Sequence, residues 1–421
     1  MSKVSGALLN FYFFIFFWFW FLAIWIFILI FRIIFFKEIK LFIKKTFFPK
    51  RKCSVFYFEV FGPESAGNKY RSHKWVEILN ANNFKAKSVH VFDYREYLQL
   101  TSHKSSMPFF LMGFMWFRFL QILQSSFYDI VIVRRELLQF NDYGNSFFEK
   151  FLSAVHNKRI LDFDDDIAAA KNEPKQISFF GKLILESPRK FSSSLKYYTA
   201  FFPGSGYLKN LLIEWRPEIK EEQILILPTC VDYDKYQPKN YSEIKNQLII
   251  GWVGAKGNLK SLLPLIPALN NLIRKYNFKL LVICDRPLDT QAEFPIEFIK
   301  WNQKYEVEQI HLIDIGIMPL ANSKTQKGKC GFKLIQYMGC GVVSMATALT
   351  ANNDIIDDCE NGFLVPPDAD WEIYFEKVFS LKNQYAEIGL KAYQKIKSTY
   401  SFNNQTNGLV SFLNQIGSDN K

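Results

Sequence analysis

The segment over residues 328–365 holds the residues whose types and spacing most clearly suggest chemistry. Lys329 and Lys333 stand on either side of Gly331, and an amphipathic helical run follows over residues 332–338. A loop that enters the N-terminus of a helix offers free N–H groups and the positive end of the helix dipole. Both suit a phosphate group, and glycines let the backbone approach a ligand closely. The segment therefore predicts a site for a nucleotide or another phosphorylated ligand.

A second group of chemical interest is acidic and stands at the end of the expected strand over residues 160–163. It consists of Asp162, Asp164, Asp165 and Asp166. Carboxylates this close together raise one another's pKa and can serve proton transfer. An Asp-x-Asp metal site and a helix cap are the alternatives. We expect Asp165 and Asp166 to be catalytic carboxylates that face a cleft, and we expect no metal.

The elements that must position these residues repeat as strand, loop and helix. Short apolar runs bounded by polar residues predict a mainly parallel sheet with both faces covered. In the first half they span residues 54–60, 89–92, 130–133, 160–163 and 224–227, with a helix at 70–79. In the second half strands are expected at 248–253, 278–284, 313–318 and 342–345, and helices at 259–276, 331–338 and 371–413. Two doubly wound halves place a ligand cleft between them.

The N-terminus is unlike the rest of the chain. Residues 11–31 are uncharged and almost entirely Phe, Trp, Ile and Leu, which is long enough for a helix to span a bilayer. Residues 37–52 then carry seven basic groups and one acid, which predicts an outside N-terminus and contact with anionic lipids. We therefore expect a single-pass protein of the inner membrane with a cytoplasmic body. The apolar stretch at 107–117 fits either a core helix or an interfacial helix.

The composition excludes some classes of function. The net charge is +12, but residues 1–52 carry nine basic groups and one acid, so the remaining body carries only +4. Such a body is a poor fit for nucleic acid as the main partner. The six cysteines form no CxxC pair, which argues against a structural zinc site.

Four stretches resemble the family 4 glycosyltransferases of the GT-B fold and follow one another in the same order as in that family. From the N-terminal to the C-terminal side they are LPTCVD at residues 227–232, the run GWVG with Lys260 after it, the run DIGIMPL that begins at Asp314, and GFKLIQYMGCGVVSMAT with NGFLV. The resemblance implies two Rossmann-like, doubly wound α/β domains that face a cleft. We expect these two domains at residues 53–235 and 248–400, with a linker at 236–247 and a C-terminal helix and tail at 401–421. One transmembrane helix is expected to precede them, within an anchor at 1–36 that is followed by the basic segment at 37–52.

The resemblance also implies a donor site for a nucleotide-sugar that works without a metal or a cofactor. Lys260 matches the family's diphosphate-binding lysine, and Lys256 stands beside Ala255, where the family has an arginine. The family's paired glutamates match Gly328 and Gln336, and the Gln336 amide can still bind a ribose hydroxyl. The expected donor-binding residues are Gly254, Lys256, Lys260, Asp314, Lys329, Gly331, Lys333 and Gln336.

On the acceptor side, Arg135 and Glu136 follow the strand at 130–133 and end at the expected cleft edge. Arg135 is a candidate for an acceptor phosphate, or for an ordinary surface ion pair. His73 follows the glycine-bounded loop at 62–67 and is the third catalytic candidate.

These features together predict a glycosyltransferase that moves a sugar from a UDP- or GDP-sugar to a lipid-linked or polysaccharide acceptor, with retention, in cell-surface glycan assembly. Two alternatives stay open, and the missing glutamates motivate the first of them. One is a non-catalytic glycosyltransferase-like scaffold at the membrane, and the other is a nucleotide-sugar epimerase of the same fold.

Overall fold

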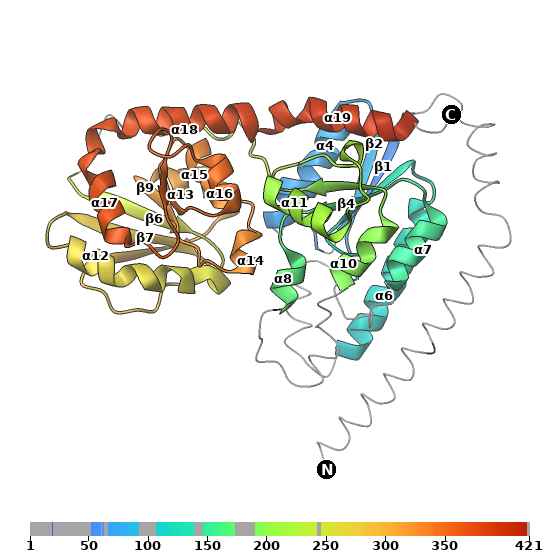
Figure 1. The fold of residues 1–421 in the computed structure, drawn as a ribbon, viewed down its shortest axis with the longest axis horizontal. Coiled ribbons are helices and arrows are strands. Elements are labelled where there is room, and N and C mark those ends of the chain that lie inside the picture. Colours follow the sequence, from blue (N-terminus) through green and yellow to red (C-terminus); the bar gives the residue numbers. More distant parts are fainter. Residues whose placement is uncertain are drawn as a thin grey trace, which may run out of the picture.

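The chain folds into two α/β domains joined along one edge by a long helical segment (Figure 1). The computed structural model describes residues 19, 52–59, 61–62, 66–91, 107–138, 146–172, 190–241 and 246–418. Each domain is built on one parallel sheet whose strands are buried on both faces, apart from one edge strand in each. The expected pair of doubly wound domains is confirmed.

The sheet of the first domain has five parallel strands in the order β2-β1-β3-β4-β5. Their bounds are β1 Ser54–Phe58, β2 Lys85–Val89, β3 Ile130–Arg134, β4 Arg159–Phe163 and β5 Ala200–Pro203. The helical elements between them are α3 Ala66–Asn68, η1 Lys69–His73, α4 Lys74–Ala81, α6 Met107–Ser125, α7 Phe147–Val155, α8 Ile167–Asn172, α10 Lys190–Ser194, η2 Leu195–Tyr197, α11 Gly206–Trp215 and η3 Glu221–Gln223. The sequence runs SVFYF and IVIVR form central strands because aliphatic and aromatic side chains suit a sheet covered on both faces.

The sheet of the second domain has six strands in the order β11-β10-β9-β6-β7-β8. Their bounds are β6 Leu248–Val253, β7 Phe278–Cys284, β8 Ile296–Lys300, β9 Ile315–Met318, β10 Val343–Thr347 and β11 Phe363–Val365. The helical elements are η4 Lys256–Leu265, α12 Ile266–Leu272, η5 Gln303–Tyr305, α13 Glu306–His311, α14 Lys324–Lys327, α15 Phe332–Gly339, α16 Thr350–Ile355, α17 Trp371–Ser380, η6 Lys382–Gln384, α18 Tyr385–Thr399 and α19 Phe402–Ser418. The strand order reverses between β6 and β9, and ligands of such sheets bind outside the carboxyl ends of the strands at that point.

The C-terminal helices connect the two domains. Helix α18 packs on α15 of the second domain, and α19 continues in the same direction over the first domain (Figure 1). The ring of Phe402 lies 4.9 Å from that of Trp75, and the ring of Phe412 lies 5.5 Å from that of Phe202. The core of the first domain therefore needs residues from the end of the chain.

Several expected elements lie elsewhere in the structure. Residues 224–227 make only a bridge from Phe201 to Ile224, and the neighbouring strand at this edge is β5, which the sequence reading missed. Strand β2 ends where a strand at 89–92 was expected, and β8 and β11 were not expected at all. These edge strands are short or polar, so their sequences lack the continuous apolar run on which the prediction relied.

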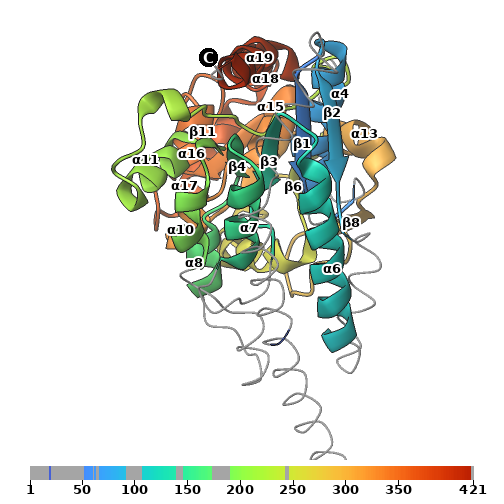
Figure 2. The ribbon, with the colours of Figure 1, turned by 90° about the vertical axis from the view of Figure 1, so that its right-hand side faces the viewer.

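Helix α6 extends beyond the body of the first domain (Figures 1 and 2). One face buries Phe114, Phe119 and Ile122 in the core, as the core-helix alternative predicted. The other face exposes Trp116 and Phe117.

The expected location as a single-pass protein of the inner membrane is corrected by the structure. In the part of the chain that it describes, no helix has both the length and the apolar character needed to cross a bilayer. The run at 11–31 and the basic segment at 37–52, on which that expectation rested, lie outside the described residues except for Phe19 and Lys52.

A glycine in β9 sets how tightly α15 packs on the second sheet. A Cβ atom on Gly316 would lie 2.6 Å from ring atoms of Tyr337, which is fully buried. The Tyr337 hydroxyl accepts a hydrogen bond from the backbone N–H of Val253, 2.7 Å away, at the end of β6. The absence of a side chain at position 316 therefore lets one tyrosine join β6, β9 and α15.

We expect Gly316→Ala to lower the free energy of unfolding by about 1–3 kcal/mol, because the added methyl group overpacks the site. Urea unfolding of the purified protein measures the change. Gly257→Ala is the matched control, since nothing lies within 4 Å of a Cβ atom there. Equal stabilities of the two variants would contradict the proposed packing role of Gly316.

Candidate functional site

A cavity of about 920 Å³ opens at the carboxyl ends of β6, β9, β10 and β11. Its wall is mainly from the second domain, and the first domain contributes Asp164, Asp165 and Thr229. Of the predicted site residues it brings together Asp165, Lys260, Lys329, Gly331 and Lys333. This is the position at which the strand order predicts a ligand.

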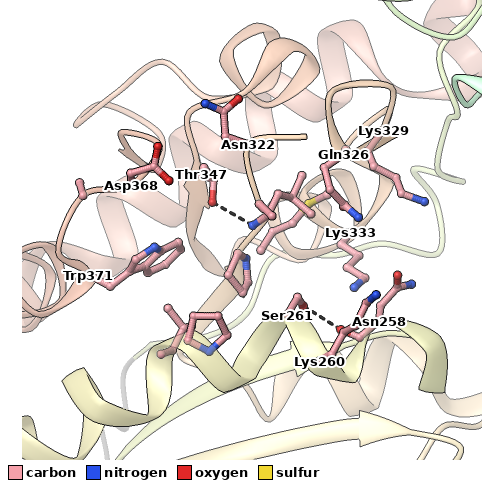
Figure 3. A pocket seen from close by; sticks show the side chains of 18 of the residues that line it. Asn258, Lys260, Ser261, Asn322, Gln326, Lys329, Lys333, Thr347, Asp368 and Trp371 are labelled. Atoms are coloured by element: carbon pink, nitrogen blue, oxygen red, sulfur yellow. Dashed lines mark hydrogen bonds between the residues drawn. The ribbon is translucent and has the colours of Figure 1, made fainter. Parts of the chain in front are cut away.

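Three lysines from separate elements line this cavity. Lys260 comes from η4, Lys329 from the turn after α14, and Lys333 from the first turn of α15. Figure 3 shows Lys333 extending toward the helix that carries Asn258 and Lys260. Because Gly331, Phe332 and Lys333 all line the cavity, the N-terminus of α15 faces it as well. Cations and a helix N-terminus together favour an anionic ligand.

The surroundings of Lys333 change its pKa strongly. Burial, with a smaller contribution from the positive charge of Lys329, lowers the pKa of Lys333 to about 7. Its ammonium lies over the Trp252 ring, 4.0 Å from the ring centroid, which stabilises the cation partly. A Cβ atom on Gly254 would lie 2.6 Å from the Lys333 nitrogen, so this glycine leaves room for the lysine without lining the cavity itself.

The aspartates of the first domain form ion pairs at the opposite wall. Asp164 is 2.9 Å from Arg134 and 3.0 Å from Arg135. Burial opposes ionisation of Asp164, but these arginines together hold its pKa well below the usual range. Asp165 pairs with Arg135 and lies 3.6 Å from Lys329 of the second domain. Asp165 is thus the carboxylate that connects the two sides of the cavity.

Asp166 has a different environment from its neighbours. Its carboxylate accepts a hydrogen bond from the backbone N–H of Ala169, 2.8 Å away, as in the helix-cap alternative. Burial raises its pKa. Its backbone and Cβ atom pack so closely on Gly328 that a Cβ atom there would lie 2.4 Å from that of Asp166. A glutamate at position 328, as in the family pattern, would not fit this arrangement of the domains.

The other candidates of the first domain lie away from the cavity wall. His73 is 3.0 Å from the buried carboxylate of Glu59, at the end of β1. The guanidinium of Arg135 is held by Asp164 and Asp165, and Arg135 has a positive φ of 64°. Glu136 is buried beside it.

Three donor-site candidates are also placed outside the cavity lining. Gln336 is buried, and its amide donates hydrogen bonds to Glu306 and to Tyr236. Asp314 stands just before the amino end of β9, opposite to the carboxyl ends that face the cavity, and its carboxylate binds Lys239 and the backbone N–H of Ile249. Lys256 begins η4, and its backbone N–H donates to Asp285 at 3.0 Å.

Further residues line the cavity that were not predicted from the sequence. They stand at or after the carboxyl ends of β6, β9, β10 and β11, and this position relative to the predicted strands could have identified them. This group is Asn258, Ser261, Asn322, Gln326, Thr347, Asp368 and Trp371 (Figure 3). Thr347 accepts a hydrogen bond from the backbone N–H of Leu320, and Asp370 caps α17 at the rim.

Within the described residues, no group of three or more His, Cys, Asp or Glu side chains could hold a metal ion. Asp162 and Asp164, the two aspartates of the Asp-x-Asp alternative, each form an ion pair with an arginine.

Comparisons with known proteins agree with this geometry. Residues 247–383 match the family described as glycosyl transferases group 1. A glycosyltransferase from Rickettsia africae is 15% identical, with a TM-score of 0.63 over 88% of this chain and 100% of its own. Sucrose-phosphate synthase from Thermosynechococcus elongatus is 10% identical, with a TM-score of 0.65 over 87% and 100%. Anabaena HepE, solved with UDP and glucose, is 12% identical, with a TM-score of 0.59 over 86% and 100%. No curated protein matches the chain.

The chain has the fold of the GT-B class of glycosyltransferases, and residues 247–383 match the group 1 glycosyltransferase family. Its second domain is the part that carries the group 1 family sequence. Membership of family 4 within this class stays a prediction.

Replacing Lys329 by glutamine is expected to raise the pKa of Lys333 above about 7, because removal of a nearby like charge favours the ammonium. NMR titration of the protein with ¹³C-methylated lysines, with the Lys333 signal assigned by its loss in Lys333→Arg, measures the change. Lys275→Gln, on an exposed surface, serves as the control. A Lys333 signal that titrates near 10 in the unmodified sequence would contradict the predicted environment.

Proposed function

We propose that this protein transfers a sugar from a UDP- or GDP-sugar to a lipid-linked or polysaccharide acceptor, with retention of the anomeric configuration. The observation that carries the proposal is the convergence of Lys260, Lys329 and Lys333 in one cavity at the reversal point of the second sheet. The neighbour HepE, which was solved with UDP and glucose, supports a nucleotide-sugar as donor.

The cations suit the charge that develops in such a reaction. When the bond between the sugar and the diphosphate breaks, the leaving diphosphate gains negative charge. Positioned cations and N–H groups in a partly dry site stabilise that charge most in the transition state. In this proposal Lys333 and Lys260 bind the diphosphate, Gly331 allows its close approach, and Gly254 leaves room for the Lys333 side chain. Lys329 lies between the diphosphate and the first domain.

The acceptor enters, in this proposal, on the side of the first domain. Asp165 lies at the cavity wall nearest to Lys329 and is the carboxylate that would meet the acceptor hydroxyl. Arg135 positions Asp165 through their ion pair, while Arg135 and Glu136 themselves lie away from the cavity wall. Retention and the class of acceptor follow from the family resemblance.

A second candidate function is a non-catalytic subunit with a glycosyltransferase fold. The specific observation in its favour is at the two positions where the family has glutamates. Asp166 of the first domain packs on Gly328, and the Gln336 amide is already hydrogen bonded to Glu306. Neither Gly328 nor Gln336 lines the cavity, so the two positions at which the family has glutamates offer no contact there.

Transfer of labelled sugar from a panel of UDP- and GDP-sugars to lipid extracts and polysaccharides tests the proposal. We expect transfer by the full chain, and a loss of about a hundredfold or more in kcat/KM for Lys333→Ala, because one stabilising cation of the transition state is removed. NMR of the product gives the anomeric configuration.

Lys275→Ala is the matched control, because Lys275 pairs with Glu376 on the exposed surface. Nucleotide binding without transfer over the whole panel would favour the non-catalytic subunit. A Lys333→Ala variant as active as the parent protein would contradict the donor site proposed here.

The affinity for a nucleotide-sugar is expected to depend on pH through Lys333, whose pKa burial lowers to about 7. Below pH 7 this lysine is already protonated, so the affinity is constant. Above pH 7 binding must first add a proton, and the affinity falls by up to about tenfold per pH unit until the pKa of the bound form is reached. Titration calorimetry with UDP-glucose in buffers of different ionisation heat measures both effects.

In Lys333→Arg the decrease should disappear, because a guanidinium stays charged over this range. A parent protein whose affinity is unchanged between pH 7 and 9 would refute the role of Lys333 as a titrating ligand.

A further inference from the structure

The two domains also meet at a buried polar cluster next to the cavity, made of Tyr70, Tyr236, Glu306 and Gln336. Tyr70 comes from η1 of the first domain, Tyr236 from the segment between the domains, and the other two from α13 and α15 of the second domain. Contacts within this cluster therefore join elements separated by up to 236 residues in the chain.

The carboxylate of Glu306 is at the centre of the cluster and is only 2% exposed. One oxygen accepts hydrogen bonds from the hydroxyl of Tyr70 and from that of Tyr236, the latter at 3.0 Å. The other oxygen accepts from the Gln336 amide at 2.8 Å. A buried carboxylate is costly unless it is hydrogen bonded, and hydrogen bonds to a charged acceptor are stronger than neutral ones.

Tyr70 is well suited to donate across the boundary. Burial, and then the negative charge of Glu306, raise the pKa of Tyr70, so its hydroxyl keeps its proton. The Tyr70 ring lies 4.9 Å from that of Phe332, the first residue of α15. The π-helical turn of η1, a geometry frequent at functional sites, buries Tyr70 and Arg71 in succession.

The cluster is connected to both walls of the cavity. Arg71, next to Tyr70, forms a fully buried ion pair of 2.6 Å with Asp162 at the end of β4, just before Asp164 and Asp165. On the other side, Phe332 is next to Lys333. A displacement of Tyr70 from Glu306 would therefore move the aspartates relative to the lysines.

We infer that Glu306 is a positioning residue, which holds the two domains at the separation where Asp165 faces the donor lysines. It acts through Tyr70 and touches no substrate. The inference rests on the proposed function, because it assigns the acceptor side to the first domain and the donor side to the second. Loss of the contact should lower turnover while the second domain still binds the nucleotide.

Tyr70→Phe is the sharpest test, because it removes the hydroxyl and keeps the ring against Phe332. Glu306→Gln removes the charge at constant size. We expect both variants to show a larger radius of gyration by small-angle X-ray scattering. Hydrogen exchange should become faster in peptides covering residues 66–81 and 302–312. We expect kcat to fall by about tenfold, since a hydrogen bond to a charged group is lost.

The dissociation constant for UDP, measured by calorimetry, should change by less than about twofold, because the donor lysines are in the second domain. A merely structural role would not give this separation of kcat from nucleotide affinity. Tyr305→Phe and Glu308→Gln are matched controls on exposed neighbours of Glu306 and should behave as the parent protein.

Scattering and exchange unchanged in both test variants would overturn the inference, as would a loss of UDP affinity as large as the loss in kcat. If Glu306→Gln does not fold, Tyr70→Phe still decides. If no nucleotide-sugar supports transfer by the parent protein, the proposed function fails, but scattering and exchange still show whether Tyr70 and Glu306 hold the domains together.

Discussion

The close approach of the two domains is the constraint on which the site depends. This close approach is possible because glycines stand at the positions where the two domains come nearest to each other. A side chain at Gly328 would collide with Asp166, and one at Gly204 would lie 2.8 Å from the sulfur of Cys330. With these positions free of side chains, Asp165 comes within 3.6 Å of Lys329 and the cavity acquires walls from both domains.

The charges of the cavity are divided between the domains in a way that follows from this contact. The first domain pairs Asp162 and Asp164 with its own arginines, which hold the pKa of Asp164 well below its usual range, whereas burial raises the pKa of Asp162. The second domain leaves Lys333 over the Trp252 ring, where burial lowers its pKa. An anionic ligand at Lys333 would therefore restore a charge that burial disfavours, which links binding to protonation. Glu306 adds a buried anion at the boundary whose hydrogen bonds come from both sides.

The comparison of sequence and structure separates central strands from edges. Strands β6 and β7 were predicted at their observed bounds, because a buried parallel strand needs a continuous apolar run and such runs are rare elsewhere. The run at 224–227 satisfies the same pattern but makes only a bridge. Strand β8, with alternating exposed and half-buried residues, was missed because an edge strand is specified by its neighbour more than by its own side chains. The prediction of a location in the inner membrane was wrong, because no helix among the described residues is long and apolar enough to cross a bilayer.

The amino-acid sequence by itself determined the class of fold, because buried parallel strands need continuous apolar runs. Its lysines and glycines at a helix start suit a phosphate, and a phosphorylated ligand stays a prediction. Lys260, Lys329 and Lys333, which the sequence predicted as donor-binding residues, line one cavity in the structure. Only the tertiary structure decided that Gln336 binds Glu306, that Asp314 binds Lys239 and the backbone of Ile249, and that Asp166 packs on Gly328. The physical reason is that each of these side chains has several possible partners of similar strength. The packing of distant segments selects one of them, and spacing along the chain carries no information about that choice.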